Sequence, residues 1–235
     1  MTNLPDFPHT DVTKHKRSNQ IALGFLERPA INWLVRHMPA WVTPDLLTVV
    51  ALLASVLTGV SYILSRNNPA FLWLASFGFI LNWFGDSLDG NLARYRKIER
   101  PRYGFFIDHT SDALGTLFIF LGLGLSGYVN LTLALIALVG YLLVSSMVFI
   151  YTYVSGEFRI AYVDIGPTEM RTIAILSNTL IFFIGNPIIQ LPWFKFHLYD
   201  GIVGLIIAFL FIGYIVVVIV KSIELNKLDT KPKNQ

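Results

Sequence analysis

The chain has 235 residues, of which 54% are hydrophobic and only 14% are charged, and its mean hydropathy is +0.58. These values exclude an ordinary water-soluble domain and predict a polytopic membrane protein. The net charge is +3 and cysteine is absent, which excludes disulfides and thiolate metal sites, so any metal here would be a hard cation such as Mg²⁺ or Mn²⁺.

The N-terminal arm, residues 1–40, is polar at first and then amphipathic. Its first 20 residues lack the apolar core of a signal peptide, so we expect the mature chain to begin at Met1. The segment Glu27–Met38 places its apolar residues on one face and has Pro29 where a first helical turn begins. We expect a short helix on the membrane surface. The alternative is an arm that packs on the protein's own cytoplasmic face.

Six apolar runs follow, and the first has a clear start. Thr43 can cap a helix with Pro44 in its first turn. The second and third runs are short for a bilayer at about 1.5 Å per residue, unless their helices continue through the acidic residues that border them. The sequence therefore predicts an all-α fold with six transmembrane helices in residues 41–222 and a basic tail in residues 223–235. The runs are Leu46–Leu64, Phe71–Phe84, Ala113–Ser126, Leu131–Val154, Met170–Phe183 and Gly201–Val220.

The basic residues predict the orientation in the membrane. The connection between the second and third runs holds five of them, whereas the connections on the opposite side hold only Arg66 and Lys195. We therefore expect this connection and both termini in the cytoplasm, with the protein in a bacterial inner membrane. Basic loops between apolar segments suit anionic headgroups or phosphate groups, so we do not expect nucleic-acid binding.

Two pairs of aspartates flank this basic connection. Asp86 and Asp89 lie on one face of the second helix, and Asp108 and Asp112 lie on one face of the third. Two adjacent antiparallel helices can bring all four carboxylates together, where they would repel one another unless cations neutralised them. Two divalent metals held by shared carboxylates are a recurring device for displacement at phosphorus.

The residues around these aspartates suit a phosphate-containing ligand. Gly90 lets such a ligand approach the backbone, Ala93 does so one turn later, and Arg94 adds a fixed positive charge. Together with Gly104, this pattern resembles the motif of the CDP-alcohol phosphatidyltransferase family, DxxDGxxAR followed by GxxxDxxxD. The resemblance implies that the CDP group binds at Gly90, Ala93, Arg94 and Gly104.

The resemblance also implies roles for the acids. The metals, Mg²⁺ or Mn²⁺, would be bound by Asp86, Asp89, Asp108 and Asp112, and Asp112 would also act as general base. His109 competes for that role, because an Asp-His pair stands at the same place in the choline and ethanolamine phosphotransferase branch. One departure is the nine residues between Arg94 and Gly104, where the family commonly has eight.

Other polar residues give weaker indications. Asp45 and Thr48 share a face in the first turn of the first span, near free amides that can hold an anion, so we assign them to the CDP site, although helix capping explains them equally well. The GPTE segment with Glu169 is similar to a GPxE element of the amino-alcohol branch. By contrast, Arg102, Arg159 and Arg171 suit a phosphorylated acceptor, or simply reflect the positive charge of cytoplasmic loops.

The function that we expect is transfer of a substituted phosphate group from a CDP-linked alcohol to an acceptor hydroxyl, with release of CMP, in phospholipid synthesis. A CDP-amino-alcohol donor with a lipid acceptor is favoured over CDP-diacylglycerol with a polar acceptor such as glycerol phosphate or inositol phosphate. A cation-coupled transporter and an inactive scaffold are the rival classes, against which the absence of an internal repeat and the intact aspartates argue respectively. The family often forms homodimers, so a homodimer is a possible assembly.

Overall fold

The computed structural model describes residues 23–155 and 166–230, and these form seven helices and one short hairpin. The predicted all-α class is confirmed, and the six apolar runs fall within helices, except for Ser126, which follows the last residue of α4. The two-stranded hairpin was not predicted. The elements are α1 (Gly24–His37), α2 (Pro44–Ser65), α3 (Phe71–Arg96), α4 (Pro101–Leu125), α5 (Leu131–Ser155), α6 (Pro167–Ile184), β1 (Ile188–Gln190), β2 (Lys195–His197) and α7 (Leu198–Thr230).

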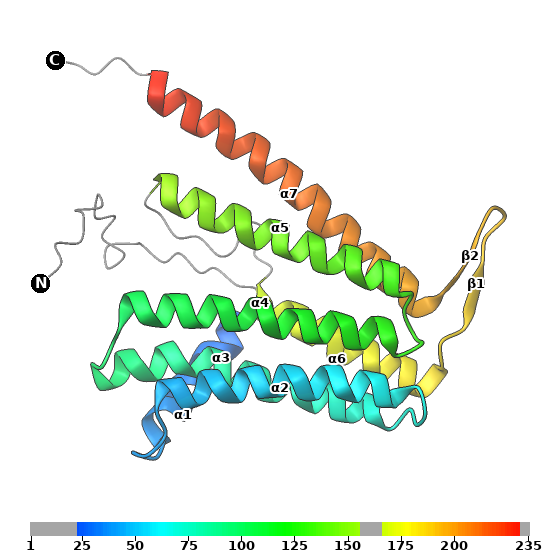
Figure 1. Ribbon diagram of the computed structural model, residues 1–235, viewed down its shortest axis with the longest axis horizontal. Coiled ribbons are helices and arrows are strands. Elements are labelled where there is room, and N and C mark those ends of the chain that lie inside the picture. Colours follow the sequence, from blue (N-terminus) through cyan, green and yellow to red (C-terminus); the bar gives the residue numbers. More distant parts are fainter. Residues whose placement is uncertain (1–22, 156–165, 231–235) are drawn as a thin grey trace, which may run out of the picture.

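Helix α2 lies against both α3 and α4 (Figure 1). It begins as predicted, since the Thr43 hydroxyl accepts a hydrogen bond from the Leu46 amide at 3.2 Å. Its close packing depends on glycines in its neighbours: a Cβ on Gly85 of α3 would lie 2.5 Å from the Leu47 carbonyl oxygen, and one on Gly122 of α4 would overlap the backbone of Gly59. Small residues at such contacts are typical of helix pairs in membranes.

Helices α3 and α4 both continue through their aspartates, as the sequence predicted. The α3 helix ends at Arg96, and Lys97 adopts a left-handed conformation with φ of 58°. Arg96 then reaches back to the loop between α1 and α2, donating to the carbonyl oxygens of Val42 at 2.5 Å and Pro39 at 2.8 Å. Two further donations go to Met38 and Ala40, at 3.1 and 3.4 Å. One side chain thereby fixes this whole loop.

The helix expected at Glu27–Met38 is present as α1, but it starts earlier, at Gly24. Pro29 consequently lies in its second turn, and the prediction of Pro29 in the first turn was wrong. Ile31 and Val35 are buried against a cluster that includes Leu88 and Leu92 of α3. The apolar face of α1 therefore packs on the protein itself, which is the alternative that the sequence left open.

Helix α7 packs mainly on α5, and it runs to Thr230. The segment predicted as a basic tail, residues 223–235, is therefore helical up to residue 230.

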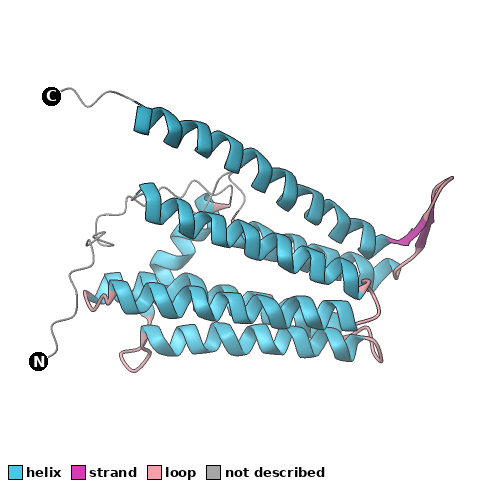
Figure 2. Cartoon of the chain, turned by 45° about the horizontal axis from the view of Figure 1, so that its top comes forward, coloured by secondary structure: helices cyan, strands magenta, loops and turns pink. Residues whose placement is uncertain are grey.

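Among the described helices, three are both long and apolar enough to cross a membrane: α2, α5 and α7. The helices α3, α4 and α6 carry the polar residues described below, which lower their hydropathy. They lie alongside the apolar helices in the same bundle (Figures 1 and 2). Six transmembrane spans therefore remain a prediction.

Candidate active site

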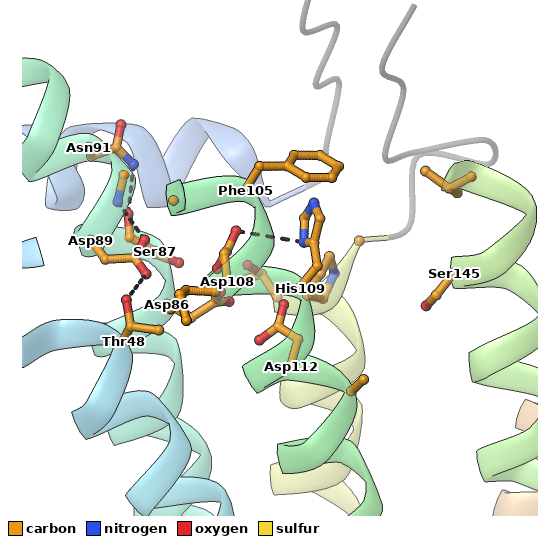
Figure 3. Close-up of a pocket in the computed structure, with 18 of the residues that line it drawn as sticks. Thr48, Asp86, Ser87, Asp89, Asn91, Phe105, Asp108, His109, Asp112 and Ser145 are labelled. Atoms are coloured by element: carbon orange, nitrogen blue, oxygen red, sulfur yellow. Dashed lines mark hydrogen bonds and ion pairs between the residues drawn. The ribbon is translucent and has the colours of Figure 1, made fainter. Parts of the chain in front are cut away.

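A cavity of about 1420 Å³ opens at the end of the bundle where α3 and α4 are connected. Residues of α1 to α4 and of α6 line one side, and residues of α5 and α7, among them the apolar Met147, Leu210 and Val217, line the other. The cavity therefore combines a polar wall with an apolar one. Figure 3 shows the polar wall.

Three of the predicted aspartates form a group on this wall. Asp86 from α3 and Asp108 and Asp112 from α4 each place a carboxylate oxygen within 4.8 Å of the others, and all three side chains are half-buried. The sequence predicted that α3 and α4 would lie next to each other, but both pack mainly on α2, and their aspartates come together beside it. Three carboxylates at this separation are a suitable donor set for a hard divalent cation, whose charge would offset their repulsion.

Asp89 lies in the same cavity but points elsewhere (Figure 3). Its carboxylate is buried and accepts a hydrogen bond from the Thr48 hydroxyl of α2 at 2.7 Å. Thr48 thus contacts an aspartate in the structure, and Asp45, one turn earlier, forms an ion pair with Arg100. This pair raises the pKa of the Arg100 guanidinium, because its charged form donates a hydrogen bond to the carboxylate.

The residues assigned to the CDP group all line the cavity, beside the aspartates. A Cβ on Gly104 would meet no atom within 4 Å, and the nearest atoms to a Cβ on Gly90 would be those of the Arg94 guanidinium, from 3.5 Å away. The backbone at both glycines is therefore open to a ligand. Arg94 also donates a hydrogen bond to Asn91 at 2.9 Å, which orients its guanidinium along the α3 helix.

His109 occupies a different part of the wall from Asp112 (Figure 3). Its Nδ1 atom lies 3.7 Å from Asp108, and its ring packs against the rings of Phe105 and Phe149, with centroids 4.2 and 5.0 Å away. Asp112 instead belongs to the carboxylate group. Both candidate bases thus lie next to Asp108, but only His109 also packs against aromatic rings.

Arg171 is the residue of α6 that contacts the acidic group. Its Nη2 atom donates to Asp86 at 2.5 Å and its Nε atom donates to Asn82 at 2.7 Å. Among the described residues predicted to bind an acceptor, it alone lines the cavity. The structure therefore gives this arginine a contact with the acidic group, in addition to any contact with a substrate.

The other predicted acceptor residues have different positions. Glu169 is buried and accepts from the Gly166 amide at 2.8 Å and the Leu23 amide at 2.9 Å, so it caps α6 and holds the start of α1. Arg102 lies in the first turn of α4 and does not line the cavity. Arg159 lies outside the described residues.

Two residues of the site were missed by the sequence analysis. Asn82 lies one helical turn before Asp86, so helical spacing from the aspartates would have indicated it. Glu27 of α1 accepts hydrogen bonds from Trp83, Ser87 and Thr168, at 3.0, 3.0 and 3.1 Å, and no local pattern marks it. These contacts join α1 to the ends of α3 and α6 that carry Asp86 and Arg171.

The fold and this site define a helical membrane protein with a carboxylate-lined cavity at one end of its bundle. The sequence model of the CDP-alcohol phosphatidyltransferase family matches residues 41–220. The chain belongs to this family, which is a class of transferases, and it is an integral membrane protein. The resemblance noted from the aspartate motif is thereby confirmed.

The relatives of this chain include a cholinephosphotransferase and two inositol phosphate synthases. A cholinephosphotransferase 1 from Danio rerio is 30% identical over 164 residues, which are 66% of this chain and 42% of the relative. An archaetidylinositol phosphate synthase from Pyrococcus horikoshii is 32% identical over 104 residues, 44% of this chain and 52% of the relative. A phosphatidylinositol phosphate synthase from Cutibacterium acnes is 38% identical over 87 residues, 37% and 39% respectively. The matches therefore span about half, or less, of the length of these relatives.

Proposed function

We propose that this chain transfers a substituted phosphate group from a CDP-linked alcohol to an acceptor hydroxyl, releasing CMP, and so makes a phospholipid or a related lipid. The observation that supports this most is the group formed by Asp86, Asp108 and Asp112, which lies in one cavity with the open backbone of Gly90 and Gly104. Family membership favours this transferase over the cation-coupled transporter that the acids alone also suggested.

The three grouped aspartates would bind Mg²⁺ or Mn²⁺, and Asp89 would serve as a fourth carboxylate ligand if it left Thr48. Bound there, the cations would offset charge on the phosphate oxygens of the substrate. Their donor set is entirely carboxylate oxygen, which suits both cations.

The chain's own residues would bind the donor and accept the proton. Arg94, Gly90 and Gly104 would hold the CDP group next to the aspartates. The acceptor oxygen would attack the β-phosphorus, the bond from that phosphorus to the CMP oxygen would break, and Asp112 would take the hydroxyl proton. We assign this role to Asp112 because it lies in the carboxylate group, whereas His109 packs between aromatic rings.

For the substrates, we propose a CDP-amino-alcohol donor and a lipid acceptor. The apolar wall of α5 and α7 gives the cavity a surface on which acyl chains can lie, beside the polar wall that suits CDP. The match to cholinephosphotransferase 1 covers more of this chain than the matches to the two inositol phosphate synthases. The second candidate is CDP-diacylglycerol with a phosphorylated polar acceptor, which those synthases and the cavity-lining Arg171 favour.

The test is CMP release by the purified protein in detergent or nanodiscs with Mg²⁺. CDP-choline and CDP-ethanolamine are paired with diacylglycerol, and CDP-diacylglycerol is paired with glycerol phosphate and inositol phosphate. The Asp108→Asn and Asp112→Asn variants should release no CMP, while His109→Ala should retain activity. Absence of CMP release with every pair, in protein that is folded and metal-loaded, would contradict the proposed function.

We further propose that the cavity end of the bundle faces the cytoplasm. The described loop between α3 and α4 holds Lys97 and Arg100, and the opposite end holds only Arg66 and Lys195 as charged basic residues among those described. Because the chain has no cysteine, single cysteines at Lys97 and Asn67 can be labelled without interference in inverted and right-side-out vesicles. Labelling of position 97 from outside right-side-out vesicles would contradict this orientation.

A further inference from the structure

The hairpin formed by β1 and β2 connects α6 to α7 at the end of the bundle opposite the acidic cavity (Figures 1 and 2). Its strands pair antiparallel, with Ile188 opposite His197 and Gln190 opposite Lys195. The Leu191 amide donates to the Phe194 carbonyl at 3.0 Å, which closes a two-residue turn at Pro192 and Trp193. We call residues 191–194 the hairpin tip.

The base of the hairpin is fastened to the bundle. Asn186 donates through its side chain to the Tyr128 carbonyl at 2.7 Å and accepts from the Tyr199 amide at 3.0 Å. The ring of Phe196 lies so close to Gly201 of α7 that a Cβ there would be 2.6 Å from it. The hairpin therefore has a fixed origin on the bundle and extends away from it (Figure 2).

Beyond this base, the hairpin exposes large apolar side chains. The exposed fraction is 90% for Trp193, 58% for Phe194, 56% for Ile188 and 45% for Leu191. An isolated two-stranded hairpin is at best marginally stable in water, because it has too little apolar surface to bury within itself. A surface of this kind indicates a contact with an apolar medium or a partner.

The surroundings of the hairpin identify that contact. Leu180, Phe183 and Ile184, in the last two turns of α6, are also exposed and apolar, so an apolar surface leads from α6 directly to Ile188. On the other side, the apolar span of α7 begins at Leu198, immediately after β2. The hairpin thus lies directly before a helix that is long and apolar enough to cross a bilayer.

The charges of the hairpin fit the same place. Between Ile184 and Tyr199 the sequence has no acidic residue, and Lys195 is its one fixed charge. Aromatic side chains, tryptophan above all, are enriched at the level of the lipid headgroups. Lysine can extend its ammonium group from there to water.

We propose that the hairpin tip inserts into the headgroup region of the leaflet opposite the acidic cavity, as an interfacial anchor for the ends of α6 and α7. The partner is the lipid surface itself. The anchor would hold the α6–α7 connection at a constant depth, while the catalytic chemistry takes place at the other membrane face. This inference rests on the membrane location of the chain and does not depend on the proposed transferase activity.

The test uses the absence of native cysteine. A Trp193→Cys variant is labelled with a polarity-sensitive fluorophore and reconstituted in liposomes with and without lipids that carry a nitroxide near the headgroup. The matched control is Asn67→Cys, in the exposed loop between α2 and α3 at the same end of the bundle. The label at position 193 should emit at shorter wavelength than the label at position 67 and should be quenched by the nitroxide lipids.

Two outcomes would overturn the proposal. Equal emission and equal quenching at positions 193 and 67 would place the tip in water. A blue shift at position 193 that disappears on dilution of the protein into excess lipid would assign the tip to a second copy of the chain. Since the substitution removes the tryptophan itself, a second variant retains Trp193 as the sole tryptophan, and quenching of its intrinsic fluorescence by brominated lipids must give the same answer.

Discussion

Removal of one grouped carboxylate, by Asp108→Asn, should have opposite effects on stability with and without metal. Asp86, Asp108 and Asp112 have oxygens within 4.8 Å of one another. At an effective dielectric constant of about 20, two unit charges at this separation repel by about 3.5 kcal/mol. The substitution removes two of the three repulsions, which is about 7 kcal/mol before Arg171 and solvent reduce it.

Metal-free Asp108→Asn protein should therefore be more stable than the wild type, by about 1 kcal/mol or more. Added Mg²⁺ should reverse the order, because a cation present at 100 times its dissociation constant stabilises the intact site by about 2.7 kcal/mol. The assay is unfolding in detergent, followed by tryptophan fluorescence, in EDTA and in a Mg²⁺ titration.

The control for this prediction is Asp45→Asn, which changes a carboxylate of the same cavity that is paired with Arg100. It should bring no gain in EDTA and should leave the Mg²⁺ stabilisation intact. If Asp108→Asn were less stable than the wild type in EDTA, or if Mg²⁺ stabilised both equally, the three carboxylates would not form a repulsive group that a cation relieves.

Three other substitutions test separate parts of the structure. Arg171→Lys should lower kcat by about 10- to 100-fold, because lysine has one nitrogen in place of the separate Nε and Nη2 atoms that reach Asn82 and Asp86, and the loss of one charge-assisted hydrogen bond is about 1.5–3 kcal/mol. Asn178→Leu should lower the free energy of unfolding by about 2 kcal/mol, because three hydrogen bonds, to Ser76, Tyr62 and Tyr199, are lost at about 0.6 kcal/mol each. Gly122→Ala should cost about 1–3 kcal/mol, since its Cβ would overlap the α2 backbone.

Each of these predictions has a matched comparison. For Arg171→Lys, the unfolding temperature should change little, and an unchanged kcat would mean that its two contacts do not affect turnover. For Asn178→Leu, the neighbouring Thr179→Ala loses only a bond within its own helix, so equal effects of the two would contradict the cluster's role. For Gly122→Ala, the control is Gly213→Ala on α7, where a Cβ meets no atom within 4 Å.

The sequence indicated the helices and the acidic group because both depend on short-range periodicity. Apolar runs showed where helices lie, Thr43 marked a start, and three- and four-residue spacing put each aspartate pair on one helix face. The spacing of residues along one helix does not determine how α3 is rotated relative to its neighbours. This rotation turns Asp89 toward Thr48 while Asp86 meets the aspartates of α4.

The sequence patterns did not predict contacts between segments that are far apart in the chain. Glu27 and Arg171 each contact partners on other helices. The sequence marked Arg171 as a candidate acceptor residue but gave no sign of its contact with Asp86, and it did not mark Glu27 at all. The amphipathic period of α1 predicted an apolar face, but not that α3 would cover it. The hairpin was missed because its strands are only three residues each, too short for an alternating pattern.

The hydrogen bonds from Arg96 to the loop between α1 and α2 can form only after both segments have been synthesised. The loop carbonyls lie 54 to 58 residues before the guanidinium that holds them. As a chain emerges from the ribosome, its N-terminal part is made first. The loop, and with it the Asp45 and Thr48 side of the cavity, would reach its final geometry only after α3 has been synthesised and has folded. The cavity would thus be completed on this side later than α1 and α2 themselves.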